Sequence, residues 1–222
     1  MSYRKTILAT GEIYHIFNRA INNQPILVNK RDCQRFTDVL FFYQRNPQIR
    51  FSHFVNLSLK ARDSAFKQLN KNKKLIEILA FVFMPNHFHL LLQQKEDNGI
   101  SLFLSRATNS FTRYYNTKYK RKGDLFESVF KAVRVETEEQ LIHLSRYIHI
   151  NPVVSFFINE KELVSYPFSS FSDYLKGESS LLDLKPVLSH FKNPQEYRKF
   201  VFDQIDYGKK LEKIKHLLLE VR

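Results

Sequence analysis

Two histidines one residue apart interrupt an otherwise apolar run, FVFMPNHFHLLLQ, at residues 81–93. The apolar and aromatic residues on both sides of Pro85-Asn86 predict two antiparallel strands joined by a tight turn. Because side chains in a strand alternate between the two faces of a sheet, His87 and His89 would leave it side by side. A neutral imidazole nitrogen is a common metal ligand, so the pair can hold one divalent ion. Histidines that are simply satisfied in the core or at the surface are the alternative, since two ligands do not define a site.

A second stretch, TEEQLIHLSRYIHINPV at residues 137–153, has the pattern of a helix. Thr137 and Gln140 fit a capping box, and two glutamates follow the cap, where they suit the positive end of a helix. Pro152 disfavours helical geometry at the residue before it, so we expect the helix to end nearby. An apolar stripe along this helix can seat it on the sheet.

His143, Tyr147 and Asn151 form a polar stripe of the same helix at i, i+4 and i+8. A tyrosine phenol becomes a covalent nucleophile once it is deprotonated or hydrogen-bonded to a base, and an asparagine carbonyl oxygen can bind a hard cation. His143 could hydrogen-bond the phenol or contact a phosphate, and a plain surface histidine is equally compatible. The alternative for Tyr147 and Asn151 is a half-buried aromatic ring and a residue that caps the helix.

The composition indicates a globular protein with a polyanionic partner. The 222 residues include 35 Lys and Arg against 22 Asp and Glu, which gives a net charge of +13. Such a balance points to nucleic acid or to an anionic membrane surface. No apolar run approaches the ~18 residues of a spanning helix, and the N-terminal residues have no signal-peptide core, so we expect a cytoplasmic protein without membrane segments. The single cysteine, Cys33, should be a buried apolar residue.

Strand-like and helix-like segments alternate along the chain without repeats. This alternation, together with the expected hairpin, predicts an α+β fold in which helices cover one face of an antiparallel sheet. Residues 58–75 are polar and lysine-rich, which favours an excursion outside the core. We expect one main domain at 1–165 and a C-terminal helical extension at 166–222 that packs on it.

Basic and tyrosine residues alternate in FTRYYNTKYKRKGDLF. This composition suits contacts with phosphates and stacking of unpaired bases, so single-stranded or hairpin DNA is the expected partner. The alternative is a solvated helix end in which at least one tyrosine packs inward. Tyr147 is preferred to these tyrosines as nucleophile, because only Tyr147 has a potential ligand one helical turn away. The candidate DNA-binding residues are Arg113, Tyr114, Tyr115, Lys118, Tyr119, Lys120, Arg121 and Lys122.

The combination of MPNHFHLLL with SRYIHINPV resembles the single-tyrosine HUH transposases, in particular the REP-associated tyrosine transposases. These are bacterial DNA-nicking and strand-transfer enzymes with a ferredoxin-like sheet, and the resemblance extends over about 11–174. It implies that His87, His89 and Asn151 bind Mg²⁺ or Mn²⁺ and that Tyr147 is the nucleophile. In GDLFESVFKA the pair Ser128-Val129 replaces the family's Gly-Arg, although Lys131, a further DNA-binding candidate, is retained.

The resemblance implies metal-assisted phosphoryl transfer on hairpin-bearing single-stranded DNA. The expected intermediate is a 5′-phosphotyrosine with a free 3′-OH, which keeps the bond energy for rejoining in DNA transposition and recombination. A bacterial cytoplasmic location follows, nucleoid-associated when DNA is bound, as a monomer or a homodimer. Two alternatives stay open: a domesticated, non-catalytic protein that binds single-stranded or structured nucleic acid, and a metal nuclease that uses water.

Overall fold

The computed structural model describes residues 6–220, and the side chains of α9 only as far as residue 213. A four-stranded antiparallel sheet is combined with helices before, between and after the strands. The strands are β1 (Ile13–Arg19), β2 (Ile76–Met84), β3 (His87–Gln94) and β4 (Lys131–Arg134). The α-helices are α1 (Lys30–Tyr43), α2 (Phe51–Val55), α3 (Leu59–Lys71), α4 (Gly99–Lys118), α5 (Glu138–Val154), α6 (Phe171–Lys176), α7 (Lys185–Leu188), α8 (Pro194–Phe202) and α9 (Ile205–Glu220). Two short 3-10 helices lie at Ile21–Asn23 and Glu160–Ser165.

The sheet has the strand order β2-β3-β1-β4. The predicted hairpin is confirmed, because β2 pairs with β3 in antiparallel register and only Pro85-Asn86 separates them. In the register of β1 with β3, Phe17 lies opposite His89 and Arg19 lies opposite His87. On its other edge, β1 places Phe17 opposite Lys131 of β4. This pairing brings residues from three separate parts of the sequence onto one face of the sheet.

Helices α1 and α4 cover one face of this sheet. On that face Phe88 contacts Phe36 of α1, and Phe36 in turn contacts Phe111 of α4, with ring centroids 5.2 and 4.9 Å apart. All three side chains are buried, so they form the centre of the main core. The predicted α+β, ferredoxin-like antiparallel sheet with a C-terminal helical extension is confirmed, but helices cover both faces of the sheet and not one as expected.

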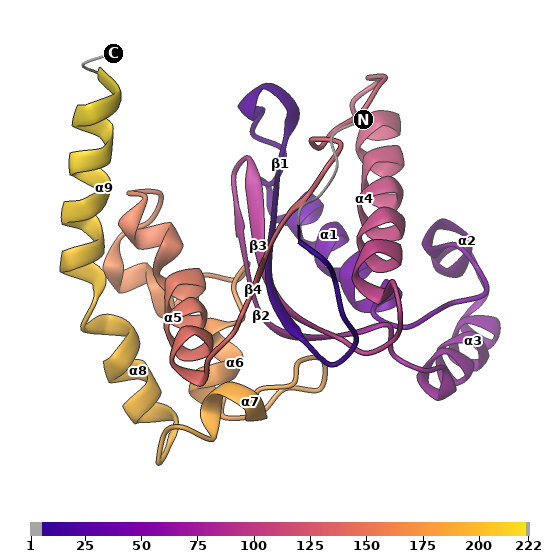
Figure 1. Cartoon of the computed structure of the whole chain (residues 1–222). Coiled ribbons are helices and arrows are strands. Elements are labelled where there is room, and N and C mark those ends of the chain that lie inside the picture. The colour runs from indigo at the N-terminus through magenta and orange to yellow at the C-terminus, as the bar shows by residue number, and fades with distance from the viewer. Residues whose placement is uncertain (1–5, 221–222) are drawn as a thin grey trace.

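Helix α5 lies on the opposite face of the sheet, as Figure 1 shows, with α6–α9 beside it. The side chain of Thr137 accepts a hydrogen bond from the backbone N–H of Gln140, which confirms the predicted cap. The helix ends at Val154, two residues after Pro152, so the expected end near this proline is confirmed, although Asn151 keeps helical geometry. Pro152 has no N–H to donate to the preceding turn, and burial of this segment holds its helical path despite the lost hydrogen bond.

The C-terminal helices pack directly on α5. An added Cβ at Gly208 of α9 would lie 2.6 Å from Cγ1 of Val154, so only glycine allows this close approach. Residues 58–75, expected outside the core, contain the helix α3, in which Leu69 is the one buried residue. Within the described residues, no helix is long and apolar enough to cross a membrane.

A buried hydrogen-bonded histidine joins α5 to the C-terminal helices. His149 Nδ1 lies 2.7 Å from the hydroxyl of Tyr197 in α8, and its Nε2 lies 2.8 Å from Oγ of Ser170, which caps α6. Burial lowers the pKa of His149 to about 3, so the ring is neutral in the folded protein at neutral pH. The hydrogen bonds therefore hold a neutral imidazole between three elements that are far apart in the sequence.

We expect His149→Gln to reduce the pH dependence of stability. In the unfolded chain His149 takes up a proton near its ordinary pKa of about 6.5, which is above the value in the folded protein. The contribution of His149 to stability is therefore complete above about pH 6.5 and falls as the pH drops towards 3. Between pH 7.5 and pH 5.5 the wild-type protein should lose about 1.4 kcal/mol through this group. Urea unfolding at both pH values would show that the difference in the free energy of unfolding between wild type and variant is smaller at pH 5.5 by that amount. The exposed His53→Gln is the control, and a gap that stays constant would contradict the prediction.

Candidate active site

A pocket of about 360 Å³ lies between the edge of α5 and the sheet face that carries the two histidines. His87, His89, Tyr147 and Asn151 all line it, so the structure brings together the four residues predicted for chemistry. Two strand positions and two helix positions meet here because α5 crosses the sheet over β2 and β3. The other lining residues are His15, Phe17, Asn18, Arg19, Glu127, Lys131, Val154, Ser155 and Glu212.

The imidazoles of His87 and His89 are neighbours on β3, with ring centroids 5.0 Å apart and ring planes at 83°. Nδ1 of His87 lies 2.7 Å from Oδ1 of Asn86. Since a carbonyl oxygen only accepts, this contact assigns the proton to Nδ1 and leaves a lone pair on Nε2. Nδ1 of His89 lies 2.9 Å from Nε2 of His15, so a third histidine holds its ring in place. Each strand histidine is thus oriented through its Nδ1.

Burial keeps two of these rings neutral. It lowers the pKa of His15 to about 4. For His89, burial and then the nearby His15, His87 and Arg19 lower the pKa to about 2. Neutral imidazole is the form that coordinates metals, so the electrostatics of the pocket favour ligation over protonation.

Tyr147 of α5 faces the histidines across the pocket. Its ring centroid is 5.6 Å from that of His89 and 6.0 Å from that of His15, with nearly perpendicular planes. The residue is 43% exposed, so a large substrate can reach the phenol. Asn151, one helical turn later, is 6% exposed and lines the same pocket. The cap of α5 is Ser155, which excludes the alternative that Asn151 is the capping residue.

The donor set fits a divalent metal ion that also takes substrate and water as ligands. Among the described residues no three His, Cys, Asp or Glu side chains converge as a complete metal site. The predicted set contains two imidazoles and an amide, and the amide oxygen of Asn151 suits hard cations such as Mg²⁺ and Mn²⁺. Three protein donors with open positions are typical of catalytic rather than structural metal sites. The roles of these residues stay predictions.

The sequence reasoning missed several residues of the pocket. His15, Phe17 and Arg19 alternate along β1 and therefore share the face of the two histidines. The signal for His15 and Arg19 was this period of two, but the pairing of β1 with β3 had to be known before it could be used. Glu127 and Glu212 bring two carboxylates to the pocket from a loop and from α9. They had no pattern in the sequence that connects them to the histidines.

His143 lies outside the pocket, although it belongs to the same predicted stripe as Tyr147. Its Nδ1 is 2.6 Å from a guanidinium nitrogen of Arg146, and its ring centroid lies 5.7 Å from that of Phe200 in α8. Glu139 is within 3.7 Å of its Nε2. The stripe diverges because two turns of helix separate His143 from Asn151, and Phe200 of α8 packs against His143. An auxiliary role beside the phenol is not supported by these contacts.

The tyrosine-rich segment is partly tied into the fold. The buried carboxylate of Asp32 accepts hydrogen bonds from the hydroxyls of Tyr114 and Tyr119 at 2.8 and 2.6 Å and from Nζ of Lys118 at 2.6 Å. Burial raises the pKa of Asp32, but these hydrogen bonds and one from Asn29 outweigh it and lower the pKa. The ring of Tyr115 is buried, as expected for at least one of the three tyrosines.

The other predicted DNA-binding residues lie in three different places. Lys120 and Lys122 are exposed, and Arg121 donates hydrogen bonds to Asn116 and to a backbone carbonyl. Arg113 lines a separate groove beside α1. Lys131 lines the candidate active site, with its Nζ 5.9 Å from the ring centroid of Phe17. The structure therefore does not gather the predicted cations into one surface.

Comparison with known proteins agrees with this arrangement. Residues 47–151, which include all four predicted catalytic positions, match the family described as "Transposase IS200 like". A protein of Haemophilus influenzae assigned as a REP-associated tyrosine transposase is 24% identical over 149 residues, which cover 63% of this chain and 83% of that protein. A REP-associated tyrosine transposase solved with a REP hairpin shares the fold, with a TM-score of 0.57 and 17% identity over 83% of this chain and 90% of that one. In its motifs, fold and these comparisons, the chain is similar to the IS200-like transposases and to the REP-associated tyrosine transposases.

Proposed function

We propose that this transposase nicks hairpin-bearing single-stranded DNA and becomes covalently joined to it through Tyr147. The observation that carries the proposal is the position of the Tyr147 ring, which faces His89 across a pocket that His87 and Asn151 also line. A phenol, a pair of oriented imidazoles and an open side for substrate are the parts required for metal-assisted transfer of a phosphoryl group.

In the nicking step the phenolic oxygen of Tyr147 attacks the scissile phosphorus. The bond from phosphorus to the 3′ oxygen breaks, the phenol loses its proton, and the leaving oxygen gains one to become a 3′-OH. The product is a 5′-phosphotyrosine ester, whose energy allows a 3′-OH of the same or another strand to displace the tyrosine and reseal DNA. A divalent ion bound by His87, His89 and Asn151 would supply charge neutralisation at the phosphate.

Other residues of the pocket orient the reacting groups. The side chains of Arg19 and Lys131 bring two cations to the pocket, one on β1 and one on β4. Both suit the non-bridging oxygens of a bound phosphodiester, which carry the negative charge. The contact between Nε2 of His15 and Nδ1 of His89 holds the imidazole of His89 and determines which nitrogen faces the pocket. The hairpin present in the solved relative supports a hairpin-bearing strand as substrate.

A strand-specific label tests the proposal. The full-length protein would be incubated with Mn²⁺ and a pool of hairpin oligonucleotides whose single-stranded flanks are randomised, labelled at either the 3′ or the 5′ end. A 5′-phosphotyrosine link retains the 3′ part of the strand, so only the 3′ label should migrate with the protein in a denaturing gel. The 5′-labelled strand should be released as a shorter product with a free 3′-OH.

Each outcome of this experiment separates the candidate functions. Transfer of the 3′ label that requires Mn²⁺ and disappears with EDTA supports the proposal. Cleavage without transfer of label would instead assign the nucleophile to water. Binding of the pool without cleavage would identify a non-catalytic nucleic-acid-binding protein and contradict the proposal.

A further inference from the structure

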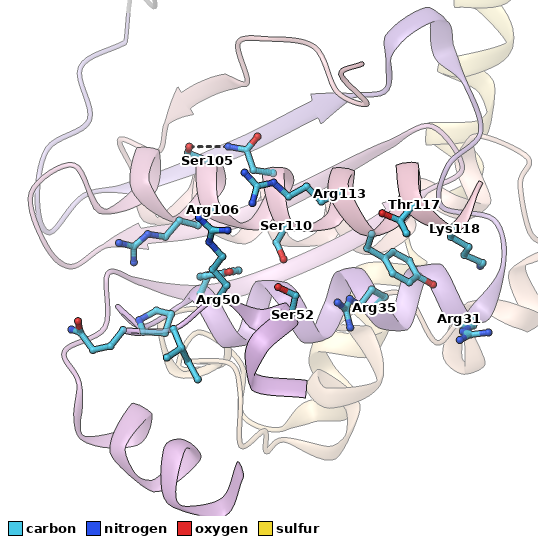
Figure 2. A pocket seen from close by; sticks show the side chains of 16 residues that line it. Arg31, Arg35, Arg50, Ser52, Ser105, Arg106, Ser110, Arg113, Thr117 and Lys118 are labelled. Carbon is cyan, nitrogen blue, oxygen red and sulfur yellow. Dashed lines mark hydrogen bonds between the residues drawn. The ribbon is translucent and has the colours of Figure 1, made fainter. Parts of the chain in front are cut away.

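A second, larger groove lies between α1, α2 and α4. These helices are on the side of the sheet opposite the candidate active site (Figure 1). Its volume is about 680 Å³. Figure 2 shows the side chains of α4 along one side of the groove and those of α1 and α2 along the other. The basic and hydroxyl side chains that line it are Arg31, Arg35, Arg50, Ser52, Ser105, Arg106, Ser110, Arg113, Thr117 and Lys118.

Helix periodicity arranges these side chains in rows. On α4 the residues Arg106, Ser110, Arg113 and Thr117 follow one another at i, i+4, i+7 and i+11, which places them on one stripe. This stripe lies away from the buried stripe with which α4 contacts the sheet. Seven residues of helix rise about 10 Å, so the two arginines of the row are spread along the helix over about two turns. The row thus suits an extended polyanion.

The arginines of the groove are not paired with carboxylates in the described part of the chain. Six of its lining residues are Arg or Lys, and none is Asp or Glu. Lys118 pairs with the buried Asp32, whereas Arg106 donates to the neutral amide oxygen of Asn46. In the described part of the chain, the five arginines of the groove form no ion pair. Their positive charge is therefore available to a ligand.

Arg35 gives independent support for an anionic ligand. Its guanidinium carbon lies 4.5 Å from the ring centroid of Phe51 and 4.9 Å from that of Tyr114, so the cation is held between two aromatic rings. Its Nε is buried without a hydrogen-bond partner among the described residues. Burial is also the main cause that lowers the pKa of Arg35. A phosphate in the groove would compensate this partly buried positive charge.

We propose that this groove binds the phosphodiester backbone of DNA outside the nicked junction. The inference extends the proposed function, because the groove and the Tyr147 pocket lie on opposite faces of the sheet and one phosphate cannot occupy both. The lining side chains are mainly N–H and O–H donors, which suit phosphate oxygens and carry no sequence preference. The groove therefore holds the DNA, while the pocket at α5 carries out chemistry on it.

A charge-matched pair of variants tests the groove. Arg106→Gln/Arg113→Gln removes two cations from the groove, and Lys192→Gln/Lys199→Gln removes two exposed cations near or on α8. Fluorescence anisotropy with a labelled DNA hairpin bearing long flanks would be measured from low to high salt. The groove variant should bind the DNA at least about tenfold more weakly than the wild-type protein. The slope of log K against log salt should become less steep by about 1.4 to 1.8, because each lost phosphate contact changes it by about 0.7 to 0.9.

The outcomes distinguish this site from the catalytic one. Equal losses in the two double variants, or an unchanged salt slope in the groove variant, would overturn the proposal. A loss that is as large with the hairpin alone as with long flanks would also overturn it, because the bound segment would then lie at the junction. Anisotropy requires no catalysis, so an inactive wild-type protein would refute the proposed function and leave the groove testable.

Discussion

Tyr147→Phe should abolish the covalent protein–DNA adduct, with a loss of about 10⁴-fold or more, while DNA affinity stays within about twofold. Phenylalanine keeps the ring that lies 5.6 Å from His89 and removes only the hydroxyl that attacks phosphorus. The position is 43% exposed on α5, so the substitution leaves the packing of the helix on the sheet intact. Transfer of a 3′ label to the protein measures the adduct, and anisotropy measures affinity.

Two other tyrosines provide the controls for this experiment. Tyr119→Phe removes a hydroxyl from the basic segment that the sequence suggested for DNA binding, and Tyr207→Phe removes an exposed hydroxyl from α9. Both variants should form the adduct. Peptide mapping of the wild-type adduct should identify YIHINPV as the modified segment. An adduct that persists in Tyr147→Phe would show that another residue is the nucleophile.

His87→Ala should reduce the Mn²⁺-dependent nicking activity by about 10²-fold or more, because loss of the imidazole as a metal ligand also removes charge neutralisation at the phosphate. His87 is the better first choice, since it is half-buried, whereas His89 is buried against His15 and its loss also disturbs that contact. The activity would be measured as adduct formed against Mn²⁺ concentration. Electron paramagnetic resonance of free Mn²⁺ would measure binding without any need for catalysis.

His190→Ala is the matched control, because this histidine follows α7 and lies outside the pocket. It should bind Mn²⁺ and form the adduct like the wild type. DNA affinity should be unchanged in both variants, as binding depends on cations elsewhere. Full activity of the wild-type protein in EDTA, or wild-type Mn²⁺ binding by His87→Ala, would exclude the metal site.

Local periodicity was enough to predict the main parts of the site. The period of two in a strand determines that His87 and His89 share a face, and this depends only on residues that are adjacent in the chain. The Thr137 cap and the helical period likewise determine that Tyr147 and Asn151 lie one turn apart. These interactions are short-range, so neighbouring residues specify them before any tertiary contact forms.

Tertiary packing decided which of these residues meet and which do not. The strand register places Arg19 and Lys131 at the histidines, and register depends on pairing between segments more than 60 residues apart in the printed sequence. His143 shares the stripe of Tyr147 but packs against α8, because the helix is long enough for its two ends to face different neighbours. Local periodicity gives the face of each element, whereas the partner of that face is set by the burial of apolar surface across the whole fold. The groove between α1 and α4 follows the same rule, since its arginines become one site only when these two helices pack together.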